Sequence, residues 1–363
     1  MGRILTEKDV EPAVRGGAVY AAGGGGWVEH GRMLGRAAVN AGAPELVSVE
    51  ELDEQDWVAT AAAIGAPAST TPWEMRGVDY VKAVELLQEA LGAPVAALMV
   101  GQNGKSSTLN AWLPSAILGC KVLDAVGDMR AHPTGDMGAI GMAGRPDPSI
   151  QTAVGGNRGQ NRYIELVVRG ATGRISPILR TASDMSGGFI ASARNPVRAG
   201  YVARNAALGG ISKALELGHA ILAAELKGPA AVLEAILFST RGSILTEGEI
   251  TAKNVTYTPE AFDVGTVTIG RGDQAITLHV MNEYMAVEDA GGTRLATFPD
   301  IITTLSPQME PLSVGELRVG MRVHVLHVPK NLVPLSAGVL DPAVYVHPEK
   351  VMGIDLASHA LEG

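Results

Sequence analysis

The stretch from residue 94 to residue 124, PVAALMVGQNGKSSTLNAWLPSAILGCKVLD, decides the fold class. It begins with the unbroken apolar run Pro94–Val100, continues into a segment of helical character over Thr108–Leu118, and ends in a second apolar strand at Cys120–Asp124. Gly119 marks the end of the helix, because glycine is the usual residue just past a helix C-terminus. Apolar strands joined by a helix are typical of a parallel sheet that helices cover on both faces.

The chain before this stretch repeats the alternation of helices and strands. Thr6-Glu-Lys-Asp9 is a capping box, which predicts a helix that ends near Tyr20. Helices are also expected over Gly31–Ala41 and Val78–Leu91, with a strand at Trp57–Ile64 between them. The sequence therefore predicts an α/β fold whose N-terminal part is a helix-covered, mostly parallel sheet.

The second half of the chain has a different pattern. Strand-like runs at Ser149–Val154 and Tyr163–Val168 precede an Ala-rich region, Pro196–Glu225, that is expected to be helical. From about Gly242, short and partly alternating runs such as Val264–Ile269 predict a β-rich, barrel-like C-terminal domain. The expected divisions are 1–168 for the α/β domain, 169–240 for a helical connection packing on it, 241–347 for the β-rich domain and 348–363 for a C-terminal tail.

Composition and charge exclude several classes of protein. The 363 residues carry a net charge of −9 and no run of Lys and Arg, so no nucleic-acid partner is expected. No apolar stretch reaches the roughly 18 residues of a membrane span, and the first residues lack the apolar core of a signal peptide. The single Cys120 cannot form an internal disulfide. We expect a soluble, cytoplasmic protein with no membrane partner.

The densest chemistry lies in the loop Asp124–Met137, which follows the second apolar strand. Asp128 and His132 are the best acid and base candidates, because a carboxylate can orient an imidazole that moves protons near neutral pH. Together with Asp136, the same pair could instead hold a divalent metal such as zinc. A third interpretation gives the aspartates ordinary turn hydrogen bonds. The carboxyl end of a buried strand is where open α/β sheets bind ligands.

Two glycine-containing segments are candidates for binding a ligand through the backbone. The tract Gly23–Gly26 follows a helix rather than a strand, so it is either a flexible connector or a set of N–H groups that approaches a ligand. Gly101–Ser106 resembles a phosphate loop, but it is two residues shorter than the Walker spacing, which ranks nucleotide hydrolysis last. The candidate binding residues are Gly24, Gly25, Gly26, Gln102, Asn103, Lys105 and Arg130, with Asn282 and Glu283 at the end of a C-terminal strand.

Several motifs resemble the S-methyl thiohydantoin desulfurase family, in that family's order. They are Gly23–Gly26, Leu123-Asp-Ala…Gly127…Arg130-Ala…Pro133, Asn282-Glu283 and Phe298-Pro-Asp-Ile-Ile302, and the resemblance runs from about residue 4 to residue 348. It implies an α/β N-terminal domain, a barrel-like C-terminal domain and action on a five-membered, nitrogen-containing ring. In the family's reaction, water displaces methanethiol from the ring carbon between two nitrogens and leaves a hydantoin.

The key loop departs from the family pattern at five positions. That pattern has Asp, an apolar residue, an aromatic residue, an acidic residue and Gln where this chain has Val126, Asp128, His132, Thr134 and Asp136. The rearranged polar groups predict a subfamily with the same fold and a related but different chemistry.

We therefore expect a hydrolase that acts on a small five-membered cyclic amide, imide or (S-methyl)thiohydantoin-like ring by water attack at a ring carbon. Asp128, His132 and Asp136 are the catalytic candidates, and Arg130 with glycine N–H groups would stabilise developing negative charge. The cofactor is left open, with a divalent metal such as zinc as one option.

The alternative function is a non-catalytic ligand-binding or accessory subunit of a hydantoinase- or oxoprolinase-type system, in which the altered loop has lost catalysis. In both cases the expected partner is a small cyclic molecule. The Ala- and Gly-rich helices suggest a homo-oligomer, because small side chains permit close approach between subunits.

Overall fold

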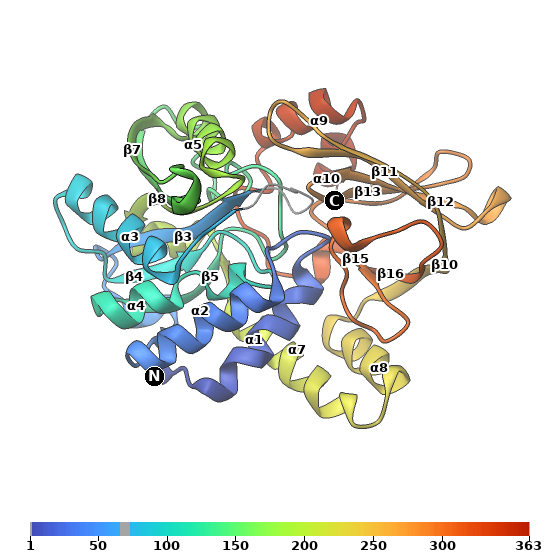
Figure 1. Ribbon diagram of the computed structural model, residues 1–363, viewed down its shortest axis with the longest axis horizontal. Helices are drawn as coiled ribbons and strands as arrows, with labels where there is room; N and C mark the ends of the chain where they lie inside the picture. The colour runs from blue at the N-terminus through green and yellow to red at the C-terminus, as the bar shows by residue number, and fades with distance from the viewer. Residues whose placement is uncertain (1, 66–72, 363) are drawn as a thin grey trace.

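Two β-sheets organise the computed structural model, which describes residues 2–65 and 73–362 (Figure 1). Sheet A lies on the left of Figure 1 with its helices, and sheet B lies on the right. Sheet A contains, in spatial order, β1 (Arg3–Ile4), β2 (Glu45–Val47), β5 (Lys121–Val126), β4 (Ala97–Val100), β3 (Trp57–Gly65), β8 (Phe189–Arg198), β6 (Pro148–Gly155) and β7 (Ile164–Ala171), with the short β9 (Ala207–Leu208) paired to β5.

The parallel part of sheet A is the run β2-β5-β4-β3, and the remaining pairings are antiparallel. The predicted α/β class is confirmed. In β3 the neighbours Val58 and Ala59 belong to different apolar clusters, because successive side chains of a strand point to opposite faces. Both faces are therefore buried, as the unbroken apolar runs predicted.

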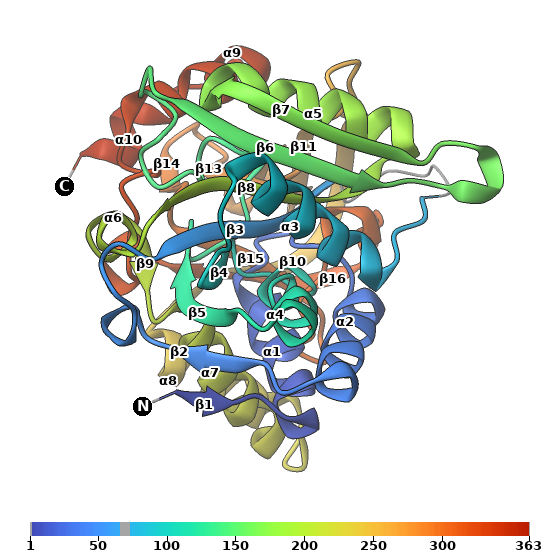
Figure 2. The same ribbon diagram turned by 90° about the vertical axis from the view of Figure 1, so that its left-hand side faces the viewer.

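Helices cover both faces of sheet A. The first half of the chain supplies α1 (Glu7–Tyr20), α2 (Val28–Ala41), α3 (Gly77–Leu91) and α4 (Trp112–Leu118), and the second half supplies α5 (Thr172–Ser186), α6 (Ala199–Asn205) and α7 (Gly210–Glu225). Leu87 of α3 and Leu179 of α5 belong to different apolar clusters. The two helices lie on opposite faces of the sheet (Figure 2). No helix within the described ranges is long and apolar enough to cross a membrane.

The segment expected as a helical connection, 169–240, differs from the prediction. Its strand β8 lies inside sheet A between β3 and β6, and helix α5 precedes it. The predicted helical region from Pro196 to Glu225 is instead the end of β8, the short helix α6, β9 and α7. β8 continues through Arg194, Asn195 and Pro196 because it pairs on both sides in the sheet, a long-range contact that local pattern does not reveal.

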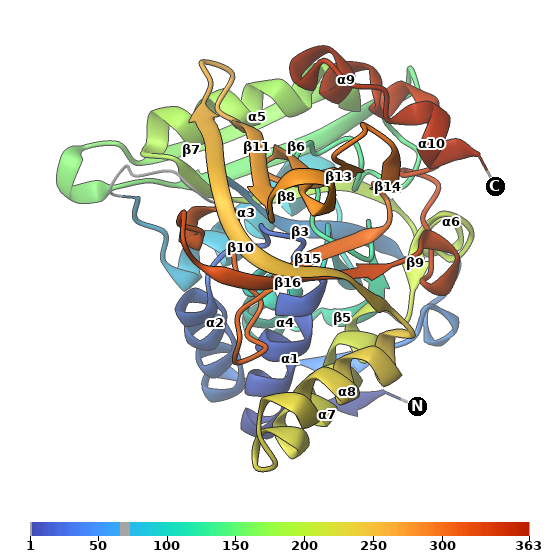
Figure 3. The ribbon, with the colours of Figure 1, turned by 90° about the vertical axis from the view of Figure 1, so that its right-hand side faces the viewer.

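Sheet B is a curled antiparallel half-barrel. Its strands, in spatial order, are β14 (Arg294–Thr297), β13 (Glu283–Asp289), β12 (Ile276–Met281), β11 (Asp263–Ile269), β10 (Ser243–Tyr257), β16 (Arg322–Val328) and β15 (Ile301–Leu305). The long β10 pairs with β16 along its first part and with β11 along its second, so it carries the curvature (Figure 3). The expected barrel-like C-terminal region is confirmed.

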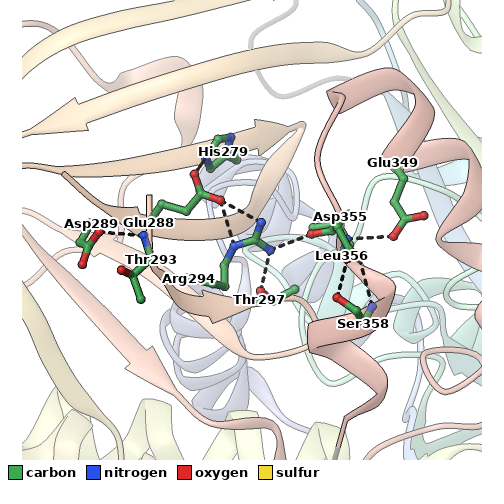
Figure 4. Close-up of polar contacts among 10 residues, drawn as sticks. All are labelled: His279, Glu288, Asp289, Thr293, Arg294, Thr297, Glu349, Asp355, Leu356 and Ser358. Atoms are coloured by element: carbon green, nitrogen blue, oxygen red, sulfur yellow. Dashed lines mark hydrogen bonds and ion pairs between the residues drawn. The ribbon is translucent and has the colours of Figure 1, made fainter. Parts of the chain in front are cut away.

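The segment expected as a C-terminal tail, 348–363, contains the end of one short helix and all of a second. These helices are α9 (Val346–Met352) and α10 (Ala357–Leu361). Leu356, which directly precedes α10, and Ala360, which lies in it, are buried in a cluster with Phe298, the residue after β14. Arg294 fixes this arrangement, because its guanidinium donates to Glu288 Oε1 at 2.9 Å and to the carbonyl oxygen of Asp355 at 2.9 Å (Figure 4).

Glycines bring two helices into backbone contact at the base of the molecule. A Cβ atom on Gly16 of α1 would overlap the carbonyl oxygen of Ala214 in α7, and one on Gly218 of α7 would overlap the carbonyl oxygen of Pro12. The small residues of these helices, which suggested a subunit interface, therefore pack within the chain. Helix α8 (Pro229–Thr240) follows α7, and its Ile236 is buried in the same apolar cluster as Ile221 of α7.

Replacing Gly218 by Ala is expected to lower the free energy of unfolding by about 1–3 kcal/mol, because α1 and α7 must move apart to admit the methyl group. Denaturant unfolding of the purified protein measures this. Gly159→Ala is the control, because a Cβ there meets nothing nearer than Asn157 Oδ1 at 3.4 Å. Equal unfolding free energies for the two variants would contradict the proposed helix packing.

Candidate functional site

The C-terminal end of α1 and the glycine tract after it form the junction of the two sheets. The last carbonyl groups of a helix have no partner within the helix and must find one elsewhere. Here the carbonyl oxygen of Tyr20 accepts the N–H of Ala131, and that of Ala22 accepts the N–H of Tyr284 in β13. The carbonyl oxygen of Gly23 likewise accepts the backbone N–H of Val314. Segments from both sheets therefore meet at this tract.

The loops after β4 and β5 lie side by side, as their shared position at the carboxyl ends of parallel strands predicts. Asp128 donates its backbone N–H to the carbonyl oxygen of Gly101 at 3.0 Å. Gln102 accepts the backbone N–H of His132 through Oε1 at 3.1 Å. These bonds hold the 124–137 loop against the loop Gly101–Ser106.

His132 and Asp128 form a buried pair. The imidazole Nδ1 lies 3.4 Å from Asp128 Oδ2, and the two side chains are 5% and 2% exposed. Neither atom has a hydrogen-bond partner. A Cβ on Gly138 would lie 2.6 Å from the second ring nitrogen, Nε2, so glycine at that position leaves room for the ring. Nε2 makes no hydrogen bond to the described part of the chain, and the residue lines the inner cavity described below.

The glycine tract supplies free backbone N–H groups. Gly25 and Gly26 adopt positive φ angles of 73° and 83°, and their N–H groups donate to no described residue. The carbonyl oxygen of Gly25 accepts the N–H of Ser106 at 3.0 Å, which fixes the tract against the neighbouring loop. A Cβ on Gly25 would lie 2.6 Å from the Cα of Gly104, so only glycine permits this approach. The tract immediately precedes α2, whose N-terminus favours negative charge.

These segments surround an inner cavity of about 70 Å³. Six of the predicted site residues line it, namely Gly25, Gly26, Gln102, His132, Asn282 and Glu283. An outer cavity of about 480 Å³ shares the wall residues Thr134, Gly135, Ser176 and Arg180 with it. The outer cavity also contains Asp136 and His347. The two cavities are therefore neighbours, and the imidazole of His132 lines the inner one.

Sequence reasoning missed the aromatic wall of the inner cavity. Trp27 and Phe189 line it and meet edge to face, with ring centroids 4.6 Å apart. Trp73 stacks on Trp27 at 4.6 Å, and His30 packs edge to face on Trp73 behind it. Burial lowers the pKa of His30 to about 4, so this imidazole is a neutral packing group. An aromatic wall of this kind offers ring faces and edges against which a planar ring can pack.

Two arginines of the inner cavity were also missed, because they lie in α5 and β8, which the sequence pattern did not reveal. Arg180 donates to the carbonyl oxygens of Gly65 at 2.9 Å and Pro133 at 2.7 Å. Arg194 is only 9% exposed, and its guanidinium makes no hydrogen bond to the described residues. Burial and the nearby Arg180 lower the pKa of Arg194 to about 10, which leaves it charged at neutral pH.

Asn282 and Glu283 reach the cavity from sheet B. Asn282 has a positive φ of 56°, and its Oδ1 accepts the N–H of Asp263 at 2.9 Å, so the chain turns sharply there. Glu283, which is 4% exposed, begins β13 directly after this turn. A Cβ on Gly24 would overlap Glu283 Oε1, so Gly24 contributes by leaving room for the carboxyl group.

The remaining predicted residues lie outside the inner cavity. Asn103 donates to the carbonyl oxygens of Met129 and Gly210, and Lys105 pairs with Glu316 at 2.8 Å, so both hold the loops in place. Arg130 is fully buried and donates to the carbonyl oxygen of Asp300 at 2.8 Å. Asp136 lies in the outer cavity, where burial raises its pKa against the opposing effects of Ser176 and Arg194.

Unsatisfied polar atoms concentrate at this site. Among the described residues, ten buried side-chain nitrogen or oxygen atoms lack a hydrogen-bond partner. Six of them belong to the 128–136 loop and to Glu283, namely Asp128 Oδ2, Arg130 Nη2, His132 Nδ1, Thr134 Oγ1, Asp136 Oδ1 and Glu283 Oε2. Buried polar groups are normally bonded, so a cluster of exceptions marks a place where a ligand or water completes the network.

The donor set does not fit the zinc option. Within residues 2–65 and 73–362, no group of three or more His, Cys, Asp and Glu side chains is arranged to hold a metal ion. Asp128 contacts His132 from inside the fold, whereas Asp136 faces the outer cavity.

Comparisons with known proteins agree with the fold. The model of the S-Me-THD-like N-terminal domain matches residues 8–164, and that of the S-Me-THD-like C-terminal domain matches residues 172–334. An X-ray structure of a protein from Chromobacterium violaceum shares the fold, with a TM-score of 0.66 and 24% sequence identity over 90% of this chain and 91% of that chain. No curated protein matches the sequence. Because both domain models match in order along the chain, the protein belongs to the S-Me-THD-like family.

Proposed function

We propose that this protein is a hydrolase that acts on a five-membered cyclic amide, imide or S-methyl-thiohydantoin-like ring by water attack at a ring carbon. The family membership supports a thiohydantoin desulfurase type of enzyme. The observation that carries the proposal is that the His132–Asp128 pair lies beside the same small cavity as the free N–H groups of Gly25 and Gly26. A base and oxyanion donors around one ligand site are the parts that such a reaction needs.

His132 acts as the general base in this proposal. Its Nε2 accepts a proton from water, while Asp128 beside Nδ1 holds the ring orientation and stabilises the imidazolium that forms. The Asp128 carboxylate is already buried next to the ring. It can therefore stabilise the positive charge on His132 without first moving into place.

The glycine N–H groups and the arginines stabilise developing negative charge. As the C=N bond of the ring opens, charge moves onto the ring nitrogen, and the donors at Gly25 and Gly26 are already in place. The guanidinium groups of Arg180 and Arg194 face the same cavity and add a favourable potential. Trp27 and Phe189 form an apolar aromatic wall of the cavity, against which a planar ring can pack.

The reaction balances with water as the only co-substrate. The water oxygen bonds to the ring carbon, one water proton goes to His132, and the imidazolium then passes it to the ring nitrogen. The hydroxyl of the addition product then loses its proton as the C=O bond forms and the C–S bond breaks with its electron pair on sulfur, and one proton in total passes from that oxygen to the departing sulfur. The products are the cyclic amide and methanethiol.

His132→Ala is expected to lower kcat by about 100- to 10,000-fold, because no other group replaces the base. Asp128→Asn is expected to lower it by about 100-fold or more, because the imidazole loses its partner charge. Release of methanethiol from a panel of S-methyl thiohydantoins, followed with a thiol reagent, measures both effects; ring opening of hydantoins and cyclic imides is followed separately by the loss of the intact ring.

His219→Ala is the matched control for these variants, since that imidazole lies on α7 and is half exposed. Full turnover by folded His132→Ala protein would contradict the assignment of the base. Saturable binding of the ring by the wild-type protein without any product would favour the non-catalytic, accessory function instead.

Arg194→Gln is expected to separate catalysis from stability. The variant removes buried charge that has no hydrogen-bond partner, so its Tm should equal or exceed that of the wild type. Its kcat/KM should fall by about 10- to 1000-fold, because a charge facing the reacting ring is lost. Arg198→Gln, on the same strand but outside the cavity, should keep full activity. A lower Tm with unchanged kinetics would assign Arg194 a structural role.

A further inference from the structure

Glu283 is a buried carboxyl group with no partner inside the protein. Its Oε2 makes no hydrogen bond, and no cation of the described residues lies within ion-pair distance of it. The backbone around it is fixed, because Tyr284 donates its N–H to Ala22 at 2.9 Å and Asn282 donates to Asp263 at 2.7 Å. The carboxyl group is therefore held at the wall of the inner cavity rather than placed there by a flexible loop.

Four charged groups on three segments influence Glu283 electrostatically, but none of them forms an ion pair with it, and the adjoining glycine tract carries no charge. They are Arg130 and Asp128 from the loop after β5, Arg180 from α5 and Asp263 from β11. Burial outweighs the two arginines and raises the pKa of Glu283 to about 8, with smaller contributions from the two aspartates. The group consequently holds its proton at neutral pH, while the neighbouring Asp128 serves the imidazole.

The geometry points to Glu283 as the catalytic general acid that protonates the departing sulfur, opposite His132 as the base in the same cavity. This assignment rests on the proposed function. The Glu283 O–H proton goes to the methylthio sulfur as the C–S electron pair leaves, so neutral methanethiol departs. The hydroxyl proton of the addition product then returns Glu283 to its acid form, and the balance of atoms is unchanged.

Leaving-group dependence tests the assignment. With the S-methyl substrate, Glu283→Gln should lower kcat by about 100- to 10,000-fold, because methanethiolate is a poor leaving group without a proton. With an S-(4-nitrophenyl) analogue, whose thiolate leaves unaided, the same variant should lose about tenfold or less. His132→Ala should lose activity toward both substrates. Glu249→Gln, a partly exposed residue of β10, is the control and should keep both activities.

Equal losses with both substrates would overturn the role of Glu283 as an acid but leave the proposed hydrolase intact. Absence of turnover by the wild-type protein on any ring of the panel would overturn both.

A second measurement needs no substrate. The unfolded chain releases the Glu283 proton near its ordinary pKa of 4.5, whereas the folded protein keeps it up to about 8. The folded state thus binds more protons between these values, so the wild type should lose stability relative to Glu283→Gln as the pH rises from about 5 to about 8. Denaturant unfolding at several pH values gives this difference. A difference that does not change with pH would show that Glu283 is ionised at neutral pH, which would overturn the assignment.

Discussion

The arrangement of the site depends on the carbonyl groups at the C-terminal end of α1. A helix leaves its last carbonyls without partners, and burying them unsatisfied is costly. In this protein five distant segments satisfy the carbonyls of residues 19–25, through Thr303 Oγ1 to Val19, Ala131 to Tyr20, Tyr284 to Ala22, Val314 to Gly23 and Ser106 to Gly25. The loop that carries His132, the strand that carries Glu283 and the loop beside the glycine tract are all placed by this one set of hydrogen bonds.

The cleft combines ionisable groups that the fold leaves without partners. Arg194 and Glu283 are both nine-tenths buried, and neither makes a hydrogen bond within the described residues. By contrast, the buried Asp79 pairs with Arg158 at 2.6 Å. A buried polar or charged group without a partner destabilises the folded state, so these two groups indicate a site shaped for a ligand rather than for stability.

Local signals in the sequence revealed much of the fold. The capping box at Thr6 starts α1, and Gly92 and Gly119 end α3 and α4 with φ angles of 75°, as their positions predicted. The loops after β4 and β5 came together because the carboxyl ends of parallel strands share an edge. The strands that could not be predicted from the sequence alone are those that depend on long-range pairing. β8 is apolar only in its first half, and β10 is exposed along much of its length, so neither has a strong local pattern.

The same limit applies to the site. Motif and loop arguments reached Asp128, His132 and Glu283, but the arginines lie in elements whose patterns are weak. Arg180 sits in a helix that contains Pro177 and several serines, residues that lower helix propensity. Glu283 is buried because the chain turns at Asn282 and because Gly24 leaves room for the carboxyl group. Both features depend on the tertiary structure, so local sequence patterns do not reveal them.

The lining of the inner cavity alternates between the two halves of the chain. His132 and the glycine tract come from the part that matches the N-terminal domain model, whereas Arg180, Arg194 and Glu283 come from the part that matches the C-terminal one. The cavity thus lies at a seam between the two halves of the chain, and neither half alone supplies its whole lining. A hybrid of two relatives joined between residues 164 and 172 would combine the imidazole and glycines of one lineage with the arginines and glutamate of another, so its cavity would match that of neither parent.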